Sequence, residues 1–212
     1  MPIAWTGRDT ATVLIEDANT NDNEFQGIKV DLNTKNMRRI TVRDVEANDN
    51  DNEGVDVDIN TGGDVDADLL NVTSTESRID GFGLDISAGG DVNIDLQDVV
   101  ASNSGDDGIN MNLSAGGDIF GTGRRNSVHD NTQNGVLVDA TAGGTVHVDF
   151  GNSNLGLNSF FDNRGLDLNN INSGDYTINA EGNFWGTSTP TIGEDISAGV
   201  NAATPLPVNP NQ

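Results

Sequence analysis

The 212-residue sequence contains no cysteine, which excludes disulfide bonds and thiolate chemistry. Basic residues are also scarce: 10 Lys and Arg stand against 34 Asp and Glu, so the net charge is -24. Nucleic-acid binding depends on clustered basic side chains, and a nucleic acid is therefore excluded as the default partner. No apolar run approaches the length of a membrane span and no signal peptide opens the chain, so we expect no membrane insertion.

Large side chains are few as well. Aromatic residues make up 5% of the chain and hydrophobic residues 34%, which is little for a core built on large side chains. Low hydrophobicity combined with high net charge is typical of disordered chains. A regular internal repeat argues against disorder here.

The repeat has a period of 27 residues. Gly-Gly recurs at 62, 89, 116 and 143, in steps of 27, and the first three copies are followed by Asp64, Asp91 and Asp118. A second motif, glycine followed by alternating apolar residues, begins at 27, 54, 83, 108, 135 and 165. Its steps are uneven, which predicts that length variation lies in the turn before this glycine.

Within each repeat the apolar residues alternate, as they do in strands. Val55 and Val57 share one face with Ile59, and the same phase points Ile109 inward and Asn110 outward. Each repeat contains three short strands and three turns, which together make one coil of a parallel β-solenoid. We therefore predict an all-β fold of six to seven coils, stacked at the ordinary strand spacing of about 4.8 Å.

Charge supports this register, since residues 27 apart become stacked neighbours. The pairs expected to meet are Glu16 with Arg43, Lys29 with Asp56, Arg39 with Asp66, and Asp98 with Arg125. The same register maps Ile3 onto Val30 and Trp5 onto Leu32. The chain thus begins inside a strand, and we expect further coils of the same polypeptide N-terminal to residue 1.

Residues 1–186 resemble the right-handed parallel β-helix repeat family, the architecture of pectate lyases and polygalacturonases. The resemblance rests on the Asn-rich turns at 126–138 (NSVHDNTQNGVLV) and 158–168 (NSFFDNRGLDL) and on the closing motif AEGNFWG at 180–186. This motif is similar to the Asn-x-Trp-Gly ending of non-enzymatic bacterial surface proteins. The resemblance implies a right-handed, single-stranded coil that Phe184 and Trp185 cover. Residues 187–212, with four prolines, then resemble a C-terminal strap and Pro-rich linker.

One segment suggests catalysis. In SGDDGIN (104–110), Asp106 and Asp107 resemble the paired aspartates of polygalacturonases, which act as acid and base at a glycosidic bond. The other motifs of that family are missing. The alternative interpretation is a turn in which Asp side chains bind the local backbone, so whether the chain is an enzyme stays open, with the balance against catalysis.

A second set of residues suggests metal binding. Asp64, Asp91 and Asp118 occupy equivalent positions on three successive coils, where stacked carboxylates repel one another. Ca²⁺ prefers several carboxylate and carbonyl oxygens and would relieve this repulsion, so it is the candidate cofactor. The alternative is a solvated acidic face whose Asp side chains cap their own turns.

Three functions remain open, because this fold hosts many activities. The first is a non-catalytic structural or binding module of a larger secreted or cell-surface protein, with carbohydrate as its candidate partner. The second is a polysaccharide lyase or glycoside hydrolase that acts on an acidic polysaccharide. The third is a segment of a phage tailspike or fibre. The first two place the chain outside the cell or on its surface.

Overall fold

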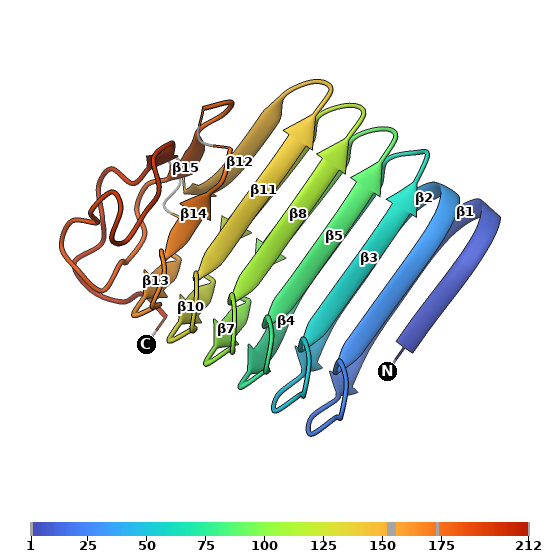
Figure 1. Cartoon of the computed structure of the whole chain (residues 1–212), viewed down its shortest axis with the longest axis horizontal. Helices are drawn as coiled ribbons and strands as arrows, with labels where there is room; N and C mark the ends of the chain where they lie inside the picture. Colours follow the sequence, from blue (N-terminus) through green and yellow to red (C-terminus); the bar gives the residue numbers. More distant parts are fainter. Residues whose placement is uncertain (1, 152–155, 173, 212) are drawn as a thin grey trace.

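The computed structural model describes residues 2–151, 156–172 and 174–211 (Figure 1). Residues 1 and 212, which begin the predicted β-helix and end the predicted tail, lie outside this part. The described chain is all-β, contains no helix and forms a parallel β-solenoid of about six turns with the 27-residue spacing. The predicted fold class is therefore confirmed.

Sixteen strands make up the described solenoid. Their bounds are β1 Pro2–Asn19, β2 Ile28–Glu46, β3 Val55–Thr61, β4 Val65–Thr75, β5 Phe82–Ala88, β6 Val92–Gln97, β7 Val100–Ser102, β8 Ile109–Ala115, β9 Ile119–Arg124, β10 Ser127–His129, β11 Val136–Ala142, β12 Val146–Gly151, β13 Ser159–Phe161, β14 Leu168–Asn170, β15 Ile178–Ala180 and β16 Val200–Asn201.

The strands form three faces, and every pairing between named strands is parallel. One face runs in the order β14-β11-β8-β5-β3-β2, and a second continues from β2 through β4, β6, β9, β12, β15 and β16. The third is shorter, with β10 between β7 and β13. Strand β2 belongs to two faces, because its first half pairs with β3 and its second half with β4.

The interior is a narrow stack of aliphatic side chains. Val55, Val57 and Ile59 are buried as the alternation predicts, and so is Ile109. Each is stacked between hydrophobic residues of the neighbouring coils. Val55, for example, pairs with Ile28 in one coil and with Phe82 in the next. A continuous core of this shape needs few aromatic residues, since each coil adds only one layer to it.

Asp and Asn are favoured at the corners of the coils. One corner is occupied at successive 27-residue steps by Asp17, Asp44, Asn71, Asp98 and Arg125, with φ between 51° and 54°. Positive φ is unfavourable for most side chains, but Asn and Asp tolerate it because their short polar groups bind the nearby backbone.

The register corrects two equivalences expected from the glycine motif. Val55 pairs with Phe82, so Gly81 rather than Gly83 follows Gly54. Val136 pairs with Leu168, so Asp167 rather than Gly165 follows Gly135. The spacing between the equivalent glycines is therefore uniform up to Gly135. The variation in repeat length does not lie in the turn before this glycine, as the sequence had suggested.

The extra residues enter elsewhere. Ile119 still pairs with Val146, 27 residues on, whereas Ser127 pairs with Ser159, 32 residues on. The insertion therefore lies between β12 and β13, in a segment that includes residues 152–155, which are outside the described part.

Three of the four expected charge pairs form. Lys29 Nζ lies 2.7 Å from Asp56 Oδ2, Arg125 Nη2 lies 2.7 Å from Asp98 Oδ2, and Arg43 pairs with Glu16. Arg39 is in register with Asp66, as expected, but its guanidinium binds Asp68 instead. The reason is geometric: Asp68 projects from the same strand two residues further on, and the long Arg side chain reaches it. The expected pairings of Ile3 with Val30 and Trp5 with Leu32 are also present.

The C-terminal residues pack onto the last coil. Trp185 is buried to 1% exposure, and its ring centroid lies 5.3 Å from that of Phe160. Beyond it, Ile196 is buried in the same core, and the Asn211 side chain donates to the carbonyls of Asn126 and Leu157. Residues 187–211 thus cover the C-terminal end of the solenoid.

Candidate functional site

The Gly-Gly-Asp row supports the backbone of the solenoid. Oδ1 of Asp64 accepts the N–H of Asp91 at 3.0 Å, Asp91 accepts that of Asp118 at 2.8 Å, and Asp118 accepts that of Thr145 at 2.6 Å. Each carboxylate also lies over the second glycine of the next coil, where any side chain would collide with it. One oxygen of each carboxylate is therefore committed to the next turn. Calcium binding by this row stays a prediction, resting on the remaining oxygens.

Asp106 and Asp107 lie in the turn before β8, where the structure adds a third acid from the coil before. Asp80 occupies the position 27 residues earlier, and its Oδ1 accepts the N–H of Asp107 at 2.8 Å. One carboxylate oxygen from each of the three residues lies within 4.8 Å of the others. Asp80 and Asp107 are buried to 6% and 4% exposure, and Asp106 is half-buried. We call Asp80, Asp106 and Asp107 the Asp80 corner.

Burial dominates the electrostatics of this corner. It raises the pKa of Asp80 to about 6; the bonds donated by Asn110 and by the N–H of Asp107 oppose the rise, while the charges of Asp107 and Asp106 add to it. Burial likewise raises the pKa of Asp107, against hydrogen bonds from Asn134. Losing water disfavours the charged form of a carboxyl group, and a neighbouring negative charge does the same.

The geometry limits the chemistry of the corner. Asp107 Oδ1 already accepts the N–H and the side-chain amide of Asn134, at 2.7 and 2.9 Å. Asp106 Oδ1 is buried without a hydrogen-bond partner among the described residues. Three carboxylates are the hard oxygen donors that Ca²⁺ prefers. An acid and a base for glycoside cleavage must flank the sugar bond, whereas two of these three side chains are withdrawn from the surface.

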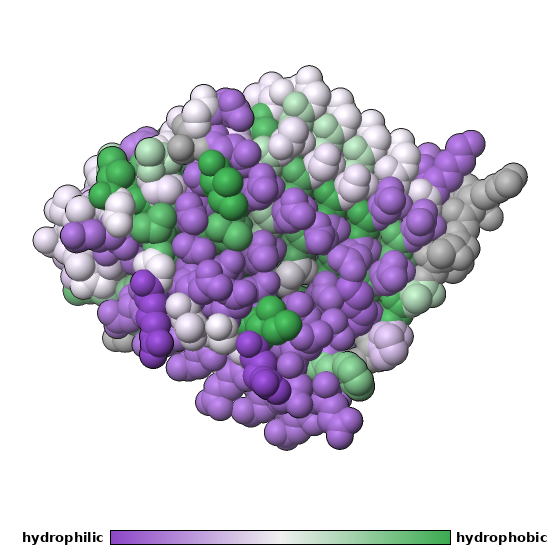
Figure 2. Space-filling model, in the orientation of Figure 1, coloured by the Kyte–Doolittle hydropathy of each residue, from purple (hydrophilic) through white to green (hydrophobic). Residues whose placement is uncertain are grey.

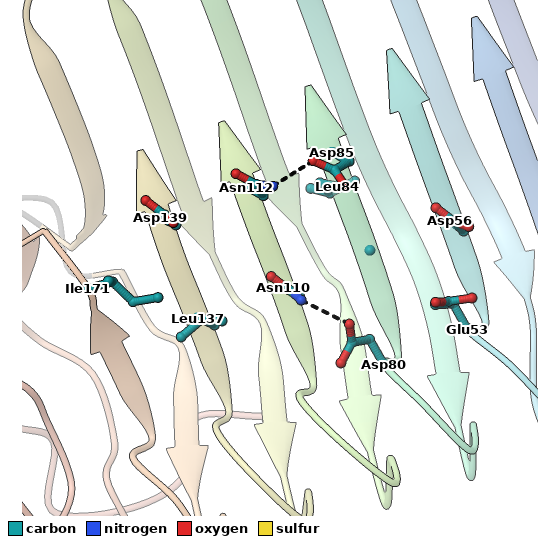
Figure 3. Close-up of a pocket in the computed structure, with 11 residues that line it drawn as sticks. Glu53, Asp56, Asp80, Leu84, Asp85, Asn110, Asn112, Leu137, Asp139 and Ile171 are labelled. Atoms are coloured by element: carbon teal, nitrogen blue, oxygen red, sulfur yellow. Dashed lines mark hydrogen bonds between the residues drawn. The ribbon is translucent and has the colours of Figure 1, made fainter. Parts of the chain in front are cut away.

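A groove opens beside this corner, on the outer face of β3, β5, β8 and β11 (Figure 3). Its volume is about 270 Å³, and we call it the acidic groove. It is lined by the acids Glu53, Asp56, Asp80, Asp85 and Asp139, the amides Asn110 and Asn112, the apolar residues Leu84, Leu137 and Ile171, and Gly83. Gly83 follows Asp56 and precedes Asn110 in one outward row, and its missing side chain hollows that row.

The acidic groove extends toward the start of the chain. A second hollow of about 440 Å³ shares Asp85 and Asn112 with it and continues past Asp58 to Asp31. Hydrophilic side chains cover most of this face, with apolar patches toward the C-terminal coils (Figure 2). The outer surface of the first sheet is thus a polar trough that crosses several coils.

The charge of the acidic groove is largely unbalanced. Among the ion pairs between described residues, only that of Lys29 with Asp56 reaches a carboxylate lining it. Burial and the charge of Asp58 raise the pKa of Asp85, while the amide of Asn112, which donates to Asp85 Oδ1 at 2.8 Å, opposes the rise. A ligand in this groove meets hydrogen-bond acceptors and negative charge, together with the exposed side chain of Ile171 at one end.

Sequence reasoning missed Asp80 and the acidic groove. Asp80 lies 27 residues before Asp107, so the repeat itself contained the signal that the two would stack. The sequence contains no such signal for the groove. The groove depends on Gly83 lying in the outward row beside Asp56, whereas the glycine motif had placed Gly83 in the turn. Asn110 points outward as predicted, but it is half-buried in the groove and donates to Asp80 Oδ2 at 3.1 Å.

Comparison of the chain with protein-family models, with curated proteins and with solved structures gives no match. Within the described residues, no helix is long and apolar enough to cross a membrane. The function must therefore be argued from the site itself.

Proposed function

We propose that this chain is a non-catalytic glycan-binding module of a secreted or cell-surface protein, and that the acidic groove holds the glycan. The observation that carries the proposal is the groove itself, an open polar trough over β3, β5, β8 and β11. Its carboxylates and amides lie in rows on successive coils, where each can accept or donate a hydrogen bond. A sugar polymer presents hydroxyl groups at regular intervals, which suits such rows.

The charge of the groove selects among glycans. Among the residues that the structure describes, five carboxylates and no Lys or Arg line the groove, so an acidic polysaccharide would be repelled. Neutral glycans and glycans with amino groups have donors for these acceptors and carry no negative charge. We therefore propose a neutral or amino-sugar polymer as the ligand.

The closing motif supports the structural part of this proposal. Asn183 is buried, and its amide donates to the carbonyls of Phe150 and Ala180, while Trp185 fills the end of the core. This packing at the C-terminal end supports our proposal that Asn-Phe-Trp-Gly is a closing motif of the kind found in non-enzymatic bacterial surface proteins. We propose membership of that group and, with it, an extracellular or cell-surface location.

A glycan-binding titration tests the proposal. Soluble neutral, amino-sugar and uronate oligosaccharides are titrated into the protein by calorimetry, and binding is expected for the first two classes. Gly83→Leu should abolish it, because a Cβ at Gly83 has ordinary contact distances of 3.7 Å to Asp56 and 3.8 Å to Glu53, so the larger side chain fills the groove. Asn93→Leu, on the outward side of β6, is the control and should bind as the unaltered chain does. Binding that survives Gly83→Leu would place the ligand elsewhere.

A polysaccharide lyase or hydrolase is the second candidate, favoured by one observation. The pKa of Asp80 at about 6 is suited to a general acid, and Asp80 lines the acidic groove. The same panel of glycans separates the two functions: incubation with the protein should release neither reducing ends nor unsaturated products if the chain only binds. Release that Asp80→Asn abolishes would establish the enzyme instead.

A further inference from the structure

One row of outward residues follows the floor of the acidic groove and of its extension from coil to coil. The strands β2, β3, β5, β8 and β11 contribute one residue each, in register: Asp31, Asp58, Asp85, Asn112 and Asp139. All five line one or both of the two hollows. We call them the groove row; its last three members lie in line across β5, β8 and β11 in Figure 3.

The charge of the groove row alternates between coils. Asp58 shares the ammonium group of Lys29 with Asp56, so its charge is balanced. Asn112 is neutral, and its amide donates to Asp85 Oδ1 at 2.8 Å. Asp31, Asp85 and Asp139 take part in none of the ion pairs between described residues. Unbalanced carboxylates therefore occupy the first, third and fifth places of the row.

A second row beside the first carries no charge. It lies two residues further along the same strands and consists of Asn33, Asn60, Ser87 and Ser114, all of which line the second hollow. Amides and hydroxyl groups both donate and accept hydrogen bonds. A ligand that covers the two rows meets neutral partners along one side and a negative charge at every second coil along the other.

This spacing suits one kind of polymer. Strands lie about 4.8 Å apart, so the unbalanced carboxylates recur about every 10 Å along the solenoid axis. In a β-1,4-linked sugar chain each ring is turned over relative to the one before, so every second sugar presents the same edge, and one sugar adds a length close to the strand spacing. An extended peptide fits less well, because side chains on one side of it recur about every 7 Å.

We propose that the acidic groove and its extension bind a β-1,4-linked amino-sugar chain that lies along the solenoid axis, with the ammonium groups of alternate sugars on Asp31, Asp85 and Asp139 and with sugar hydroxyl groups on the neutral row. This inference rests on the proposed glycan function. It narrows the ligand from neutral and amino-sugar polymers to the second class, and it adds the direction of the chain.

Calorimetry with two matched hexamers tests the charge. The amino-sugar hexamer and its N-acetylated form share one backbone, and both are long enough to reach from Asp31 to Asp139, but only the first is cationic. It should bind about tenfold tighter, since three exposed ion pairs contribute about twofold to threefold each. Asp85→Asn and Asp139→Asn should each weaken its binding about threefold and leave the N-acetylated form unchanged. Asp66→Asn, which removes an exposed charge from the outer side of β4, is the control and should change neither.

The failure of this inference differs from the failure of the proposed function. Equal affinities for the two hexamers, both lost in Gly83→Leu, would overturn the amino-sugar inference and leave glycan binding in place. No binding of either hexamer would overturn both. Oligolysine of the same charge is the comparison with a basic peptide: if it binds as tightly and is weakened as much by Asp85→Asn, the groove recognises charge alone and the inference is wrong.

A second measurement tests the spacing and needs no variant. Two N-acetylated hexamers are prepared with two free amino groups each, on alternate sugars in one and on adjacent sugars in the other. The alternate form should bind the unaltered chain about threefold tighter, because only its two ammonium groups reach two unbalanced carboxylates at once. Equal affinities for the two forms would show that the groove row does not set the register of the ligand, and would overturn the inference.

Discussion

The central coils and the C-terminal end of the solenoid are built differently. Strands β3, β5, β8 and β11 each have seven residues and pair in an unbroken register of 27. At the C-terminal end, β13, β14 and β15 have three residues each, β16 has two, and the step between coils grows to 32 at β10 and β13. The first region is held by a long ladder of uniform step, and the second by short parallel pairings of unequal step.

Different side chains stabilise the two regions. The centre uses mainly Val, Ile and Leu in a continuous stack that also includes Phe82 and Met111, and its longer strands satisfy the backbone. At the end, buried amides add to the shorter ladder: Asn158 donates to the carbonyls of Gly123 and Phe150, at 3.0 and 2.6 Å. Phe150, Phe160 and Trp185 fill the volume that short strands leave. The solenoid thus has a mainly aliphatic core where the repeat is regular, and aromatic rings gather in the core where it ends.

A charge in the central stack should have the largest effect. Ile109 is buried between Phe82 and Val136, so Ile109→Asp places an unpaired charge in the core and should cost more than about 4 kcal/mol of unfolding free energy. Urea unfolding monitored by circular dichroism measures it. Ser114→Asp introduces the same charge on the exposed side of β8 and should change stability by less than about 1 kcal/mol. Similar losses for both would mean that the strand phase is wrong.

Truncating the aromatic end should have a smaller and more local effect. Trp185→Ala removes the largest buried side chain of the C-terminal region and should cost about 3–5 kcal/mol there. Hydrogen exchange should show lost protection in β15 and β16, with β5 and β8 unchanged, because coils contact mainly their neighbours. Phe184→Ala, at the half-exposed neighbouring position, is the matched control and should lose less protection. Loss of protection across all coils would show that the end and the centre unfold as one unit.

Calcium should have the smallest effect and distinguishes the two groups of acids. Millimolar Ca²⁺ should raise the melting temperature beyond NaCl of equal ionic strength, since specific binding adds to screening. Asp91→Asn should remove most of this benefit, because Asp91 is the middle carboxylate of the Asp64–Asp91–Asp118 row; its amide oxygen can still accept the N–H of Asp118. Asp106→Asn is the comparison: if it removes the benefit and Asp91→Asn does not, the ion binds at the Asp80 corner. Equal melting curves in the two salts would exclude both positions.

The sequence by itself determined the period, the phase of the strands and hence the layered core. These follow from local rules: alternation identifies which side chains point inward, and Gly-Gly-Asp recurs because each carboxylate must bind the backbone of the next coil over a glycine. Both properties repeat in every coil, so the pattern of apolar and turn residues contains them.

Only the tertiary structure decided which side chains come into contact between neighbouring coils. The segment Gly81-Phe82-Gly83 offers two glycines that fit the motif equally well, and the pairing of Val55 with Phe82 makes Gly83 the hollow of the acidic groove. That pairing also brings Asp80 to Asp107, and the long reach of Arg39 takes it to Asp68 instead of Asp66. Such contacts depend on the alignment of neighbouring coils to within one or two residues. The hydrogen-bond ladder of the whole stack sets that alignment, and composition within one coil does not.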